Sequence, residues 1–474
     1  MPVHYCLGLT DSRFAECADP WDFGPLADEL RNTGVGEVLG PLARLPSFAW
    51  TKPRQLKSHL IAHLRFSDHG TARNFHESLK NSRLQQYGFG QDPIISAMDS
   101  WSPTAPGGGI FGDRALAERL TGATALRAAT GKGVNVIIVD RGLDQNRVTD
   151  TVARMARNRG LPDYHREREV RGWPRYEATT DRAGKRISRT ILPGATGSDH
   201  GYMIARNILA IAPEATIWDA PLLPLENEQD APPNPSTASH LFQLIKQAFE
   251  KREITSWDAD PKSDAREPCI IVNAWGVLDP ESDPDLAGYA DDPDHLLVND
   301  MERLDKAGID VVFAAGNCGE PCPDRRCGLQ DTGPGRSILG WNAHPKVLTV
   351  GAVRVDGLPV ALSAQGPGRL ARKGSGCTDY TDNLRARQKP DLSAPSHFRE
   401  SDDASEFNTG TSAACGFAAG VLAALRSVPS GRGLCPEAMR SLLRDNARPA
   451  GAGWDPRLGF GTINLANALA ALGK

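Results

Sequence analysis

Short apolar runs alternate with helix-forming patterns along most of this 474-residue chain, and this alternation restricts the fold more than any other feature. The runs are rich in β-branched residues, which is typical of strands buried in a parallel sheet. The predicted strands are Val134–Asp140, Thr216–Pro221, Cys269–Trp275, Ile309–Ala315 and Val347–Val353, and the predicted helices are Thr237–Lys251, His295–Ala307, Ser412–Ser427 and Pro436–Ala447. Such alternation predicts an α/β fold with a doubly wound, mainly parallel sheet.

Four polar residues stand where such folds place their chemistry, at the C-terminal ends of strands and the first turns of helices. Asp140 ends the first apolar run, and Asn317 follows the run that ends in Ala314-Ala315-Gly316. His200 begins an apolar helix pattern, and Ser412 begins another. Unpaired N–H groups and the positive end of the helix dipole lie near a serine in the first turn, which suits a nucleophile whose attack creates negative charge.

Each of these residues has a simpler explanation when taken alone. Asp140 fits a turn or cap residue, His200 a structural histidine, and Asn317, directly before Cys318-Gly319, a turn. Ser412 could cap its own helix. The four residues gain weight as a set, because the chain presents an acid, a histidine, an amide and a serine in that order.

In this order the motifs resemble those of the subtilisin-like serine proteases (subtilases), whose triad residues follow one another as Asp, His and Ser. Three further segments resemble family motifs, namely Lys389–Pro395, Ala212–Ala215 and Gly459–Asn464. The resemblance covers about residues 122–472 and implies a subtilisin-like catalytic domain over residues 122–474.

The resemblance implies a serine endopeptidase that needs no cofactor. Ser412 would attack a peptide carbonyl, and His200 would take its proton and later pass it to the leaving amine. Asp140 would hold the imidazole in the required tautomer. Asn317 would donate its side-chain amide to the oxyanion, beside the N–H of Ser412.

The same resemblance assigns a substrate-binding strand and a primary pocket. Ala274, Trp275 and Gly276 correspond to the family strand that pairs with an extended substrate, through backbone hydrogen bonds. Trp275 either narrows a side-chain pocket or packs into the core. Ala314, Ala315 and Gly316 would form the opposite wall of the primary pocket.

Several positions depart from the family pattern and indicate a divergent member. Arg141 follows the acid, Tyr202 follows His-Gly, and Gly416 replaces a proline after the serine. Arg141 would either favour the ionised form of Asp140 or point to solvent. Residues 144–198 are polar without a clean hydrophobic period, and we interpret them as a surface insertion. The calcium-binding loop of some secreted members is missing, so no metal site is expected.

The first hundred residues match no family catalytic motif. They show a strand, a helix, two strands and a second helix, an order compatible with a small ferredoxin-like α+β domain. These elements are His4–Leu9, Phe23–Thr33, Val35–Leu39, His59–Phe66 and Thr71–Asn81. We assign residues 1–105 to this domain and 106–121 to a linker. Family pro-domains imply an inhibitory role, and a permanently attached accessory domain is the alternative.

Composition excludes some partners and leaves the cysteines open. A net charge of −4 without a basic block argues against nucleic acid, and no apolar segment is long enough to span a membrane. The N-terminus lacks a signal peptide pattern, which predicts a cytoplasmic protein. Cysteines 318, 322, 327 and 377 could form a zinc site, a stiffening disulfide or, by default in the cytoplasm, reduced thiols. Cys415 is expected in the core.

The expected partner is a peptide or protein substrate, together with intramolecular inhibition by the N-terminal domain. Two other functions stay open. One is a dedicated processing or peptide-cyclising enzyme that uses the same triad on one partner. The other is a catalytically silent subtilase fold that serves as a binding module.

Overall fold

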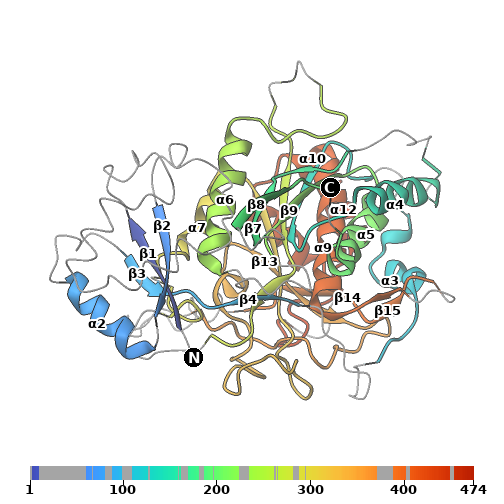
Figure 1. The fold of residues 1–474 in the computed structure, drawn as a ribbon. Helices are drawn as coiled ribbons and strands as arrows, with labels where there is room; N and C mark the ends of the chain where they lie inside the picture. The colour runs from blue at the N-terminus through green and yellow to red at the C-terminus, as the bar shows by residue number, and fades with distance from the viewer. Residues whose placement is uncertain are drawn as a thin grey trace.

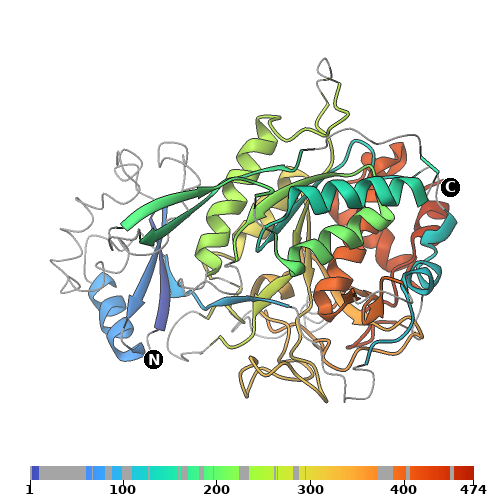
Figure 2. The ribbon, with the colours of Figure 1, turned by 45° about the vertical axis from the view of Figure 1, so that its right-hand side comes forward.

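A computed structural model gives the structure of the chain (Figure 1). It describes residues 3–9, 60–66, 68–80, 88–98, 109–125, 129–158, 160–161, 169–180, 186–195, 197–223, 234–260, 263, 265–280, 288–293, 295–370, 388–401, 406–448 and 453–473. Within these ranges a small N-terminal sheet lies beside a larger α/β body, the main domain (Figures 1 and 2).

Seven of the described strands form the central sheet of the main domain. In spatial order they are β14 (Leu392–Pro395), β13 (Leu348–Val353), β12 (Asp310–Ala314), β10 (Cys269–Asn273), β5 (Asn135–Asp140), β9 (Thr216–Pro221) and β6 (Arg171–Gly172). Every neighbouring pair in this sheet is parallel. The predicted α/β class with a parallel sheet is confirmed.

Helices cover both faces of this sheet, and alternate strand residues supply the two cores. Val136 and Ile138 of β5 belong to one core, and Ile137 and Val139 belong to the other. The first core lies against α4 (Gln145–Asn158), α5 (Asp199–Ile211), α9 (Gly410–Ser427), α11 (Pro436–Asp445) and α12 (Leu465–Leu472). The second core lies against α6 (Pro235–Glu250) and α7 (Asn299–Ala307).

Helices α5 and α9 approach each other closely because glycines line their contact. A Cβ atom on Gly416 would lie 3.0 Å from the carbonyl oxygen of Ile204, and one on Gly420 would lie 3.0 Å from that of Ile208. This fits the departure at Gly416, since a Cβ atom there would require the backbone of α5 to shift. The contact brings the first turns of the two helices together. No helix among the described residues is both long and apolar enough to cross a membrane.

The segment that we interpreted as a surface insertion is partly integral to the fold, and that interpretation is wrong for α4 and β6. Val148, Val152 and Met155 of α4 are buried, and β6 extends the central sheet beside β9. The helical spacing of these residues is obscured by the arginines of the same helix, Arg147, Arg154 and Arg157, whose apolar stems can cover a helix surface. The hairpin of β7 (Arg175–Thr180) and β8 (Arg186–Ile191) follows.

The N-terminal sheet is antiparallel, with β1 (Val3–Leu9) between β2 (Leu60–Phe66) and β3 (Gly88–Gln91). Helix α2 (His69–Lys80) follows β2. Tyr5, Phe66, Phe75 and Phe89 are buried in one aromatic cluster. This arrangement is compatible with a ferredoxin-like unit. The predicted elements Phe23–Thr33 and Val35–Leu39 lie outside the described residues.

A segment after the N-terminal sheet passes into the main domain. Strand β4 (Ile95–Ala97) pairs antiparallel with β11 (Trp275–Val277), into which the predicted run Cys269–Trp275 continues after β10. Before β4, the Asp92 carboxylate accepts a hydrogen bond from the Ser236 N–H at the N-terminus of α6 (2.9 Å). A carboxylate there is favoured by the helix dipole, so Asp92 fixes the path of this segment.

The remaining described elements are short. Helix α3 (Arg114–Leu120) and the 3₁₀ turn at Ala123–Ala125 lie at the end of the predicted linker and just beyond it. The hairpin of β15 (Phe398–Arg399) and β16 (Phe407–Asn408) leads into α9. Helix α10 (Pro429–Arg432) and a 3₁₀ turn at Gly340–Ala343 complete the list. The boundary at residue 105 stays a prediction, but the segment before residue 122 contains an ordered helix.

Stability is expected to fall between pH 6.5 and pH 4. Burial lowers the pKa of His240, His295 and His397 to about 4 and that of His344 to about 3. Below pH 6.5 the unfolded chain therefore binds more protons than the folded chain, which destabilises the fold. Burial also raises the pKa of Asp300 to about 6. Below that pH the folded chain holds the Asp300 proton more tightly than the unfolded chain does, which stabilises the fold and offsets the effect of one histidine. We expect the free energy of unfolding to fall by roughly 3–4 kcal/mol per pH unit near pH 5.

Urea unfolding monitored from pH 7.5 to pH 4.5 measures this slope. In His295→Gln the slope should decrease by the contribution of about one proton, because this titrating group is lost. The variant should still fold, because glutamine can donate to the carbonyl of Gln91, which His295 Nε2 contacts at 2.9 Å. An unchanged slope in the variant would show that His295 is already protonated in the fold.

Candidate active site

Three predicted residues from three separate elements form one hydrogen-bonded line. Asp140 is the last residue of β5, His200 lies in the first turn of α5, and Ser412 lies in the first turn of α9. His200 Nδ1 lies 2.8 Å from Asp140 Oδ1, and His200 Nε2 lies 2.9 Å from Ser412 Oγ. The structure therefore brings together the acid, the histidine and the serine that the sequence singled out.

The hydrogen bonds assign the protons in this line. The carboxylate of Asp140 can only accept, so Nδ1 of His200 carries the proton and Nε2 is left as an acceptor for the hydroxyl of Ser412. The hydroxyl also lies 3.1 Å from the carbonyl oxygen of Ala274. Its single proton can serve only one of these two acceptors at a time, and transfer to His200 is the arrangement that activates the oxygen.

Asn317 is held so that its amide nitrogen is available beside the serine. Asn317 Oδ1 accepts hydrogen bonds from the N–H of Thr411 (3.0 Å) and from its hydroxyl (2.9 Å). The buried Asn317 Nδ2 has no partner within the described residues. A buried donor without a partner is costly, and it fits a site where negative charge develops during a reaction. The role of Thr411 was missed, although it lies in the Gly-Thr-Ser motif.

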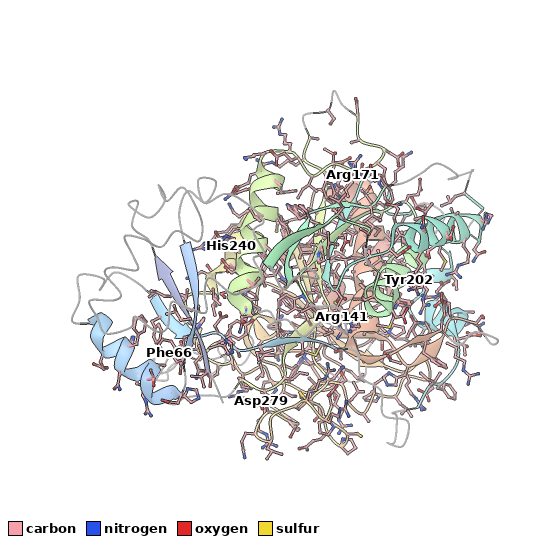
Figure 3. The ribbon with its side chains drawn as sticks, in the orientation of Figure 1. Phe66, Arg141, Arg171, Tyr202, His240 and Asp279 are labelled. Carbon is pink, nitrogen blue, oxygen red and sulfur yellow. A yellow bond between two sulfur atoms is a disulfide. The ribbon has the colours of Figure 1, made fainter. Side chains whose placement is uncertain are left out.

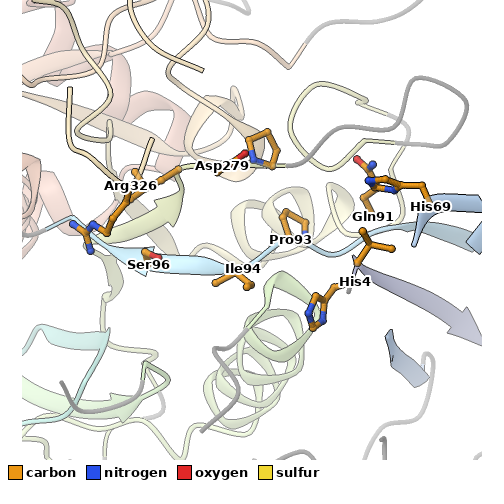
Figure 4. Close-up of a pocket in the computed structure, with 11 residues that line it drawn as sticks. His4, His69, Gln91, Pro93, Ile94, Ser96, Asp279 and Arg326 are labelled. Carbon is orange, nitrogen blue, oxygen red and sulfur yellow. The ribbon is translucent and has the colours of Figure 1, made fainter. Parts of the chain in front are cut away.

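Strand β4 occupies the groove predicted for an extended substrate. Its Ala97 pairs with Trp275, and Ser96 pairs with Gly276. The N–H of Met98 donates to the carbonyl oxygen of Ala274 (3.0 Å), the same oxygen that Ser412 Oγ approaches. The backbone of Met98 therefore lies directly beside the nucleophile. Figure 4 shows the approach, with Ile94 and Ser96 on the segment that comes from the N-terminal sheet.

Beside this segment lies a cavity of 350 Å³ between the N-terminal sheet and the main domain. Its lining includes His4 and His69 of the N-terminal domain and Asp279 and Arg326 of the main domain (Figure 4). This cavity flanks β4, whereas the triad lies beyond the end of β4.

The side chain of Met98, which is 1% exposed, lies at the place predicted for the primary pocket. A Cβ atom on Gly276 would lie 2.7 Å from Met98 Cε, and one on Gly316 would lie 4.0 Å from it. Gly276 and Gly316 thus both lie near the end of this side chain. Ala314 and Ala315, which precede Gly316, are buried at the end of β12.

Asn342 joins the two walls of this pocket and was missed from the sequence. Its Nδ2 donates to the carbonyl oxygens of Trp275 (3.0 Å) and Ala314 (2.8 Å). No motif marks it, because its role depends on a 3₁₀ turn folding back onto both strands. Trp275 itself is fully buried, and its Nε1 donates to the carbonyl of Val139 (3.0 Å). Of the two alternatives for Trp275, packing into the core is the one observed.

The departures at residues 141 and 202 do not disturb the line of hydrogen bonds. Arg141 is partly exposed next to Asp140. Tyr202 points to α4, where its hydroxyl lies 3.1 Å from Thr151 Oγ1 and the Arg147 guanidinium lies 3.8 Å from its ring centre. Figure 3 shows the positions of Arg141 and Tyr202 in the molecule. Tyr202 thus joins two helices, and His200 keeps its contacts with Asp140 and Ser412.

The cysteine cluster corrects the expectation of reduced thiols. Cys318 and Cys327 form a disulfide, so the default interpretation is wrong for this pair. The bond closes a loop directly after Asn317, whose carbonyl also accepts the N–H of Asp324 (2.9 Å). Sequence spacing alone could not select this pair among four cysteines. Cys377 lies outside the described residues, and Cys415 is buried in the core as predicted.

Comparisons with known proteins bear on the family and the fold of the chain. A family model described as "Subtilase family" matches residues 131–461. Fervidolysin from Fervidobacterium pennivorans, a keratinolytic enzyme related to subtilisin, superimposes with a TM-score of 0.55 at 13% identity. That match covers 99% of this chain, which spans 61% of the fervidolysin chain. At this identity the likeness shows the fold alone.

Two structures of MycP1 also match over 80% of this chain. One is from Mycobacterium smegmatis (TM-score 0.42, 19% identity, 89% of that chain) and the other is described as MycP1 from the ESX-1 type VII secretion system (0.43, 18%, 90%). No curated protein sequence matches the chain.

Proposed function

Because the chain belongs to the subtilase family of serine peptidases, we propose that it is an endopeptidase that cleaves extended peptide segments through an acyl-enzyme. The observation that carries the proposal is the hydrogen-bonded line from Asp140 through His200 to Ser412. The Asn317 amide nitrogen, which has no partner in the described part of the chain, supports the same conclusion. A silent binding module would have no need of these groups in this geometry.

Each group has one step in the proposed reaction. Ser412 Oγ attacks the peptide carbonyl while His200 Nε2 takes its proton, and Asp140 stabilises the imidazolium that forms. Asn317 Nδ2 and the N–H of Ser412 donate to the oxyanion. His200 then protonates the leaving amine, and a water molecule repeats the sequence to release the acyl group. Substrate main chain would add as a strand to β11.

We further propose that the N-terminal domain inhibits the enzyme by presenting β4 as a substrate-like strand. Support comes from the register of β4 on β11 and from the contact of Met98 with Ala274 beside the nucleophile. A second substrate cannot pair with β11 while β4 is there. This favours the inhibitory interpretation over an accessory domain that leaves the groove open.

Labelling with a fluorophosphonate probe tests the proposed function. We expect the full chain to react slowly, the form that has lost β4 to react rapidly at Ser412, and Ser412→Ala to stay unlabelled in both forms. Intact mass of the active form shows whether the N-terminal segment has been removed. Absence of labelling in every form would establish a silent fold, and rapid labelling of the intact chain would overturn the inhibitory role.

The residues of β4 also predict a substrate preference. The side chains of Ile95 and Met98 are almost fully buried. Ser96, which pairs with Gly276 through its main chain, has a partly exposed side chain. We expect the peptide Ile-Ser-Ala-Met-p-nitroanilide to be cleaved with a kcat/KM about 100-fold above that of Ile-Ser-Ala-Asp-p-nitroanilide, because a carboxylate would lose its hydration in this apolar pocket. Equal rates would show that Met98 does not represent a substrate side chain.

The disulfide indicates in which kind of cellular compartment the protein folds. A Cys318–Cys327 bond is typical of an oxidising environment, so we propose such a compartment in place of the predicted cytoplasm. The proposed partner remains a peptide or protein, and neither nucleic acid nor a membrane is proposed.

A further inference from the structure

Residues 111–113, just ahead of α3, add to the hairpin that leads into the nucleophile. The N–H of Phe111 donates to the carbonyl of His397 (2.7 Å), and the N–H of Arg399 donates to the carbonyl of Gly112 (3.0 Å). The other strand of the hairpin, β16, ends at Asn408, four residues before Ser412. The segment predicted as a linker is therefore bound to the framework of the site.

Arg114, the first residue of α3, makes the strongest contacts of this segment. It is 8% exposed and binds Glu400 through two hydrogen bonds, Nε to Oε1 (2.7 Å) and Nη2 to Oε2 (2.9 Å). Its Nη2 also donates to Asn207 Oδ1 (2.6 Å). A bidentate guanidinium–carboxylate pair of this kind fixes both position and orientation.

Asn408, which ends β16 shortly before Ser412, binds both Glu400 and the helix that holds His200. Its Nδ2 donates to Glu400 Oε2 (3.1 Å), and its Oδ1 accepts from Asn207 Nδ2 (2.9 Å) and Arg206 Nη2 (3.2 Å). Arg206 and Asn207 lie on α5, two turns beyond His200. The network therefore joins three parts: the segment before α3, the loop before Ser412 and the helix of His200.

In the folded chain the buried Glu400 of this network is ionised, because two arginines compensate its charge. Burial alone would raise the pKa of Glu400, but the guanidinium groups of Arg114 and Arg206 hold it at about 2. Glu400 is thus a carboxylate at neutral pH, paired with two buried arginines. Removal of one arginine leaves a buried charge without part of its compensation, which strongly perturbs the local structure.

We propose that Arg114 is a positioning residue that sets the distance between Ser412 and His200, so that residues 111–114 remain part of the working enzyme. The inference rests on the proposed peptidase activity. Any activating cleavage must then fall before residue 111, and a cut directly after Met98 would leave the anchor attached. Displacement of a nucleophile by about 1 Å can lower a rate by about 100-fold, so a distant anchor can affect the chemical step.

Kinetics of the active form of Arg114→Ala test this proposal. We expect kcat to fall at least tenfold with KM within about twofold, because the groove on β11 is untouched, and the rate of fluorophosphonate labelling should fall in parallel. Arg114→Lys should recover part of kcat, since an ammonium group can reach Glu400 but cannot span Glu400 and Asn207 together. Arg119→Ala is the matched control, an exposed arginine of the same helix, and should behave like the wild type.

A second variant tests the same proposal if Arg114→Ala does not fold. Arg114→Met with Glu400→Gln removes both charges and keeps the volume, and it should fold while its kcat stays at least tenfold low. A wild-type kcat in either variant overturns the positioning role. Absence of labelling in the wild type itself would instead refute the peptidase, so the two failures are distinguishable.

Discussion

Replacement of Ser412 by alanine is expected to lower kcat by about a millionfold, the loss found when a related subtilisin loses its nucleophile. The hydroxyl that lies 2.9 Å from His200 Nε2 is the only group in the line that can form the acyl bond. Alanine is a good residue for the first turn of α9, and Ala413 and Ala414 already follow, so the fold should persist. Peptide hydrolysis by the active form, with circular dichroism and thermal unfolding alongside, measures both parts of the prediction.

Two further variants make this result specific. Ser427→Ala removes a hydroxyl from the other end of α9, where it donates to Ala424, and should leave kcat unchanged. His200→Ala in the Ser412→Ala background should add almost nothing to the loss, because triad residues act as one unit. Substantial activity in Ser412→Ala would show that another residue is the nucleophile.

The proposed catalytic residues stand out in the sequence because their positions follow from local rules. Asp140 ends a run of buried β-branched residues, and parallel strands place such ends at one edge of the sheet. His200 and Ser412 begin apolar helices, and the family resemblance gives their order and roles. The distances between them required the structure, because they depend on the close contact of α5 with α9 at Gly416.

What sequence reasoning missed depends on contacts between distant segments. Met98 and β4 carry no motif, and their register on β11 appears only once both domains are folded. Asn342 and Arg114 likewise act through partners that are distant in the sequence, such as Trp275 for Asn342 and Glu400 for Arg114. Helix α4 was missed for another reason. Its apolar residues stand among arginines and other polar residues, so the apolar positions do not form a clear helical period.

Replacement of Asn317 by alanine is expected to lower kcat by about 100- to 1,000-fold and to leave KM nearly unchanged. Its buried Nδ2 has no partner among the residues that the structure describes, so it has little to contribute until the carbonyl oxygen becomes an oxyanion. An interaction made only in the transition state changes kcat and kcat/KM together, and this separates Asn317 from a residue that merely binds substrate.

The control for Asn317 is Asn158→Ala, which removes an exposed amide from α4 and should have no effect. Because Asn317 Oδ1 also holds Thr411, thermal unfolding of Asn317→Ala must be measured beside its kinetics. A loss of kcat with a cooperative, nearly unshifted unfolding transition identifies an oxyanion donor. A loss that appears mainly in KM would instead place Asn317 in ground-state binding, and the negative charge of the reaction would then depend on the N–H groups at the start of α9 alone.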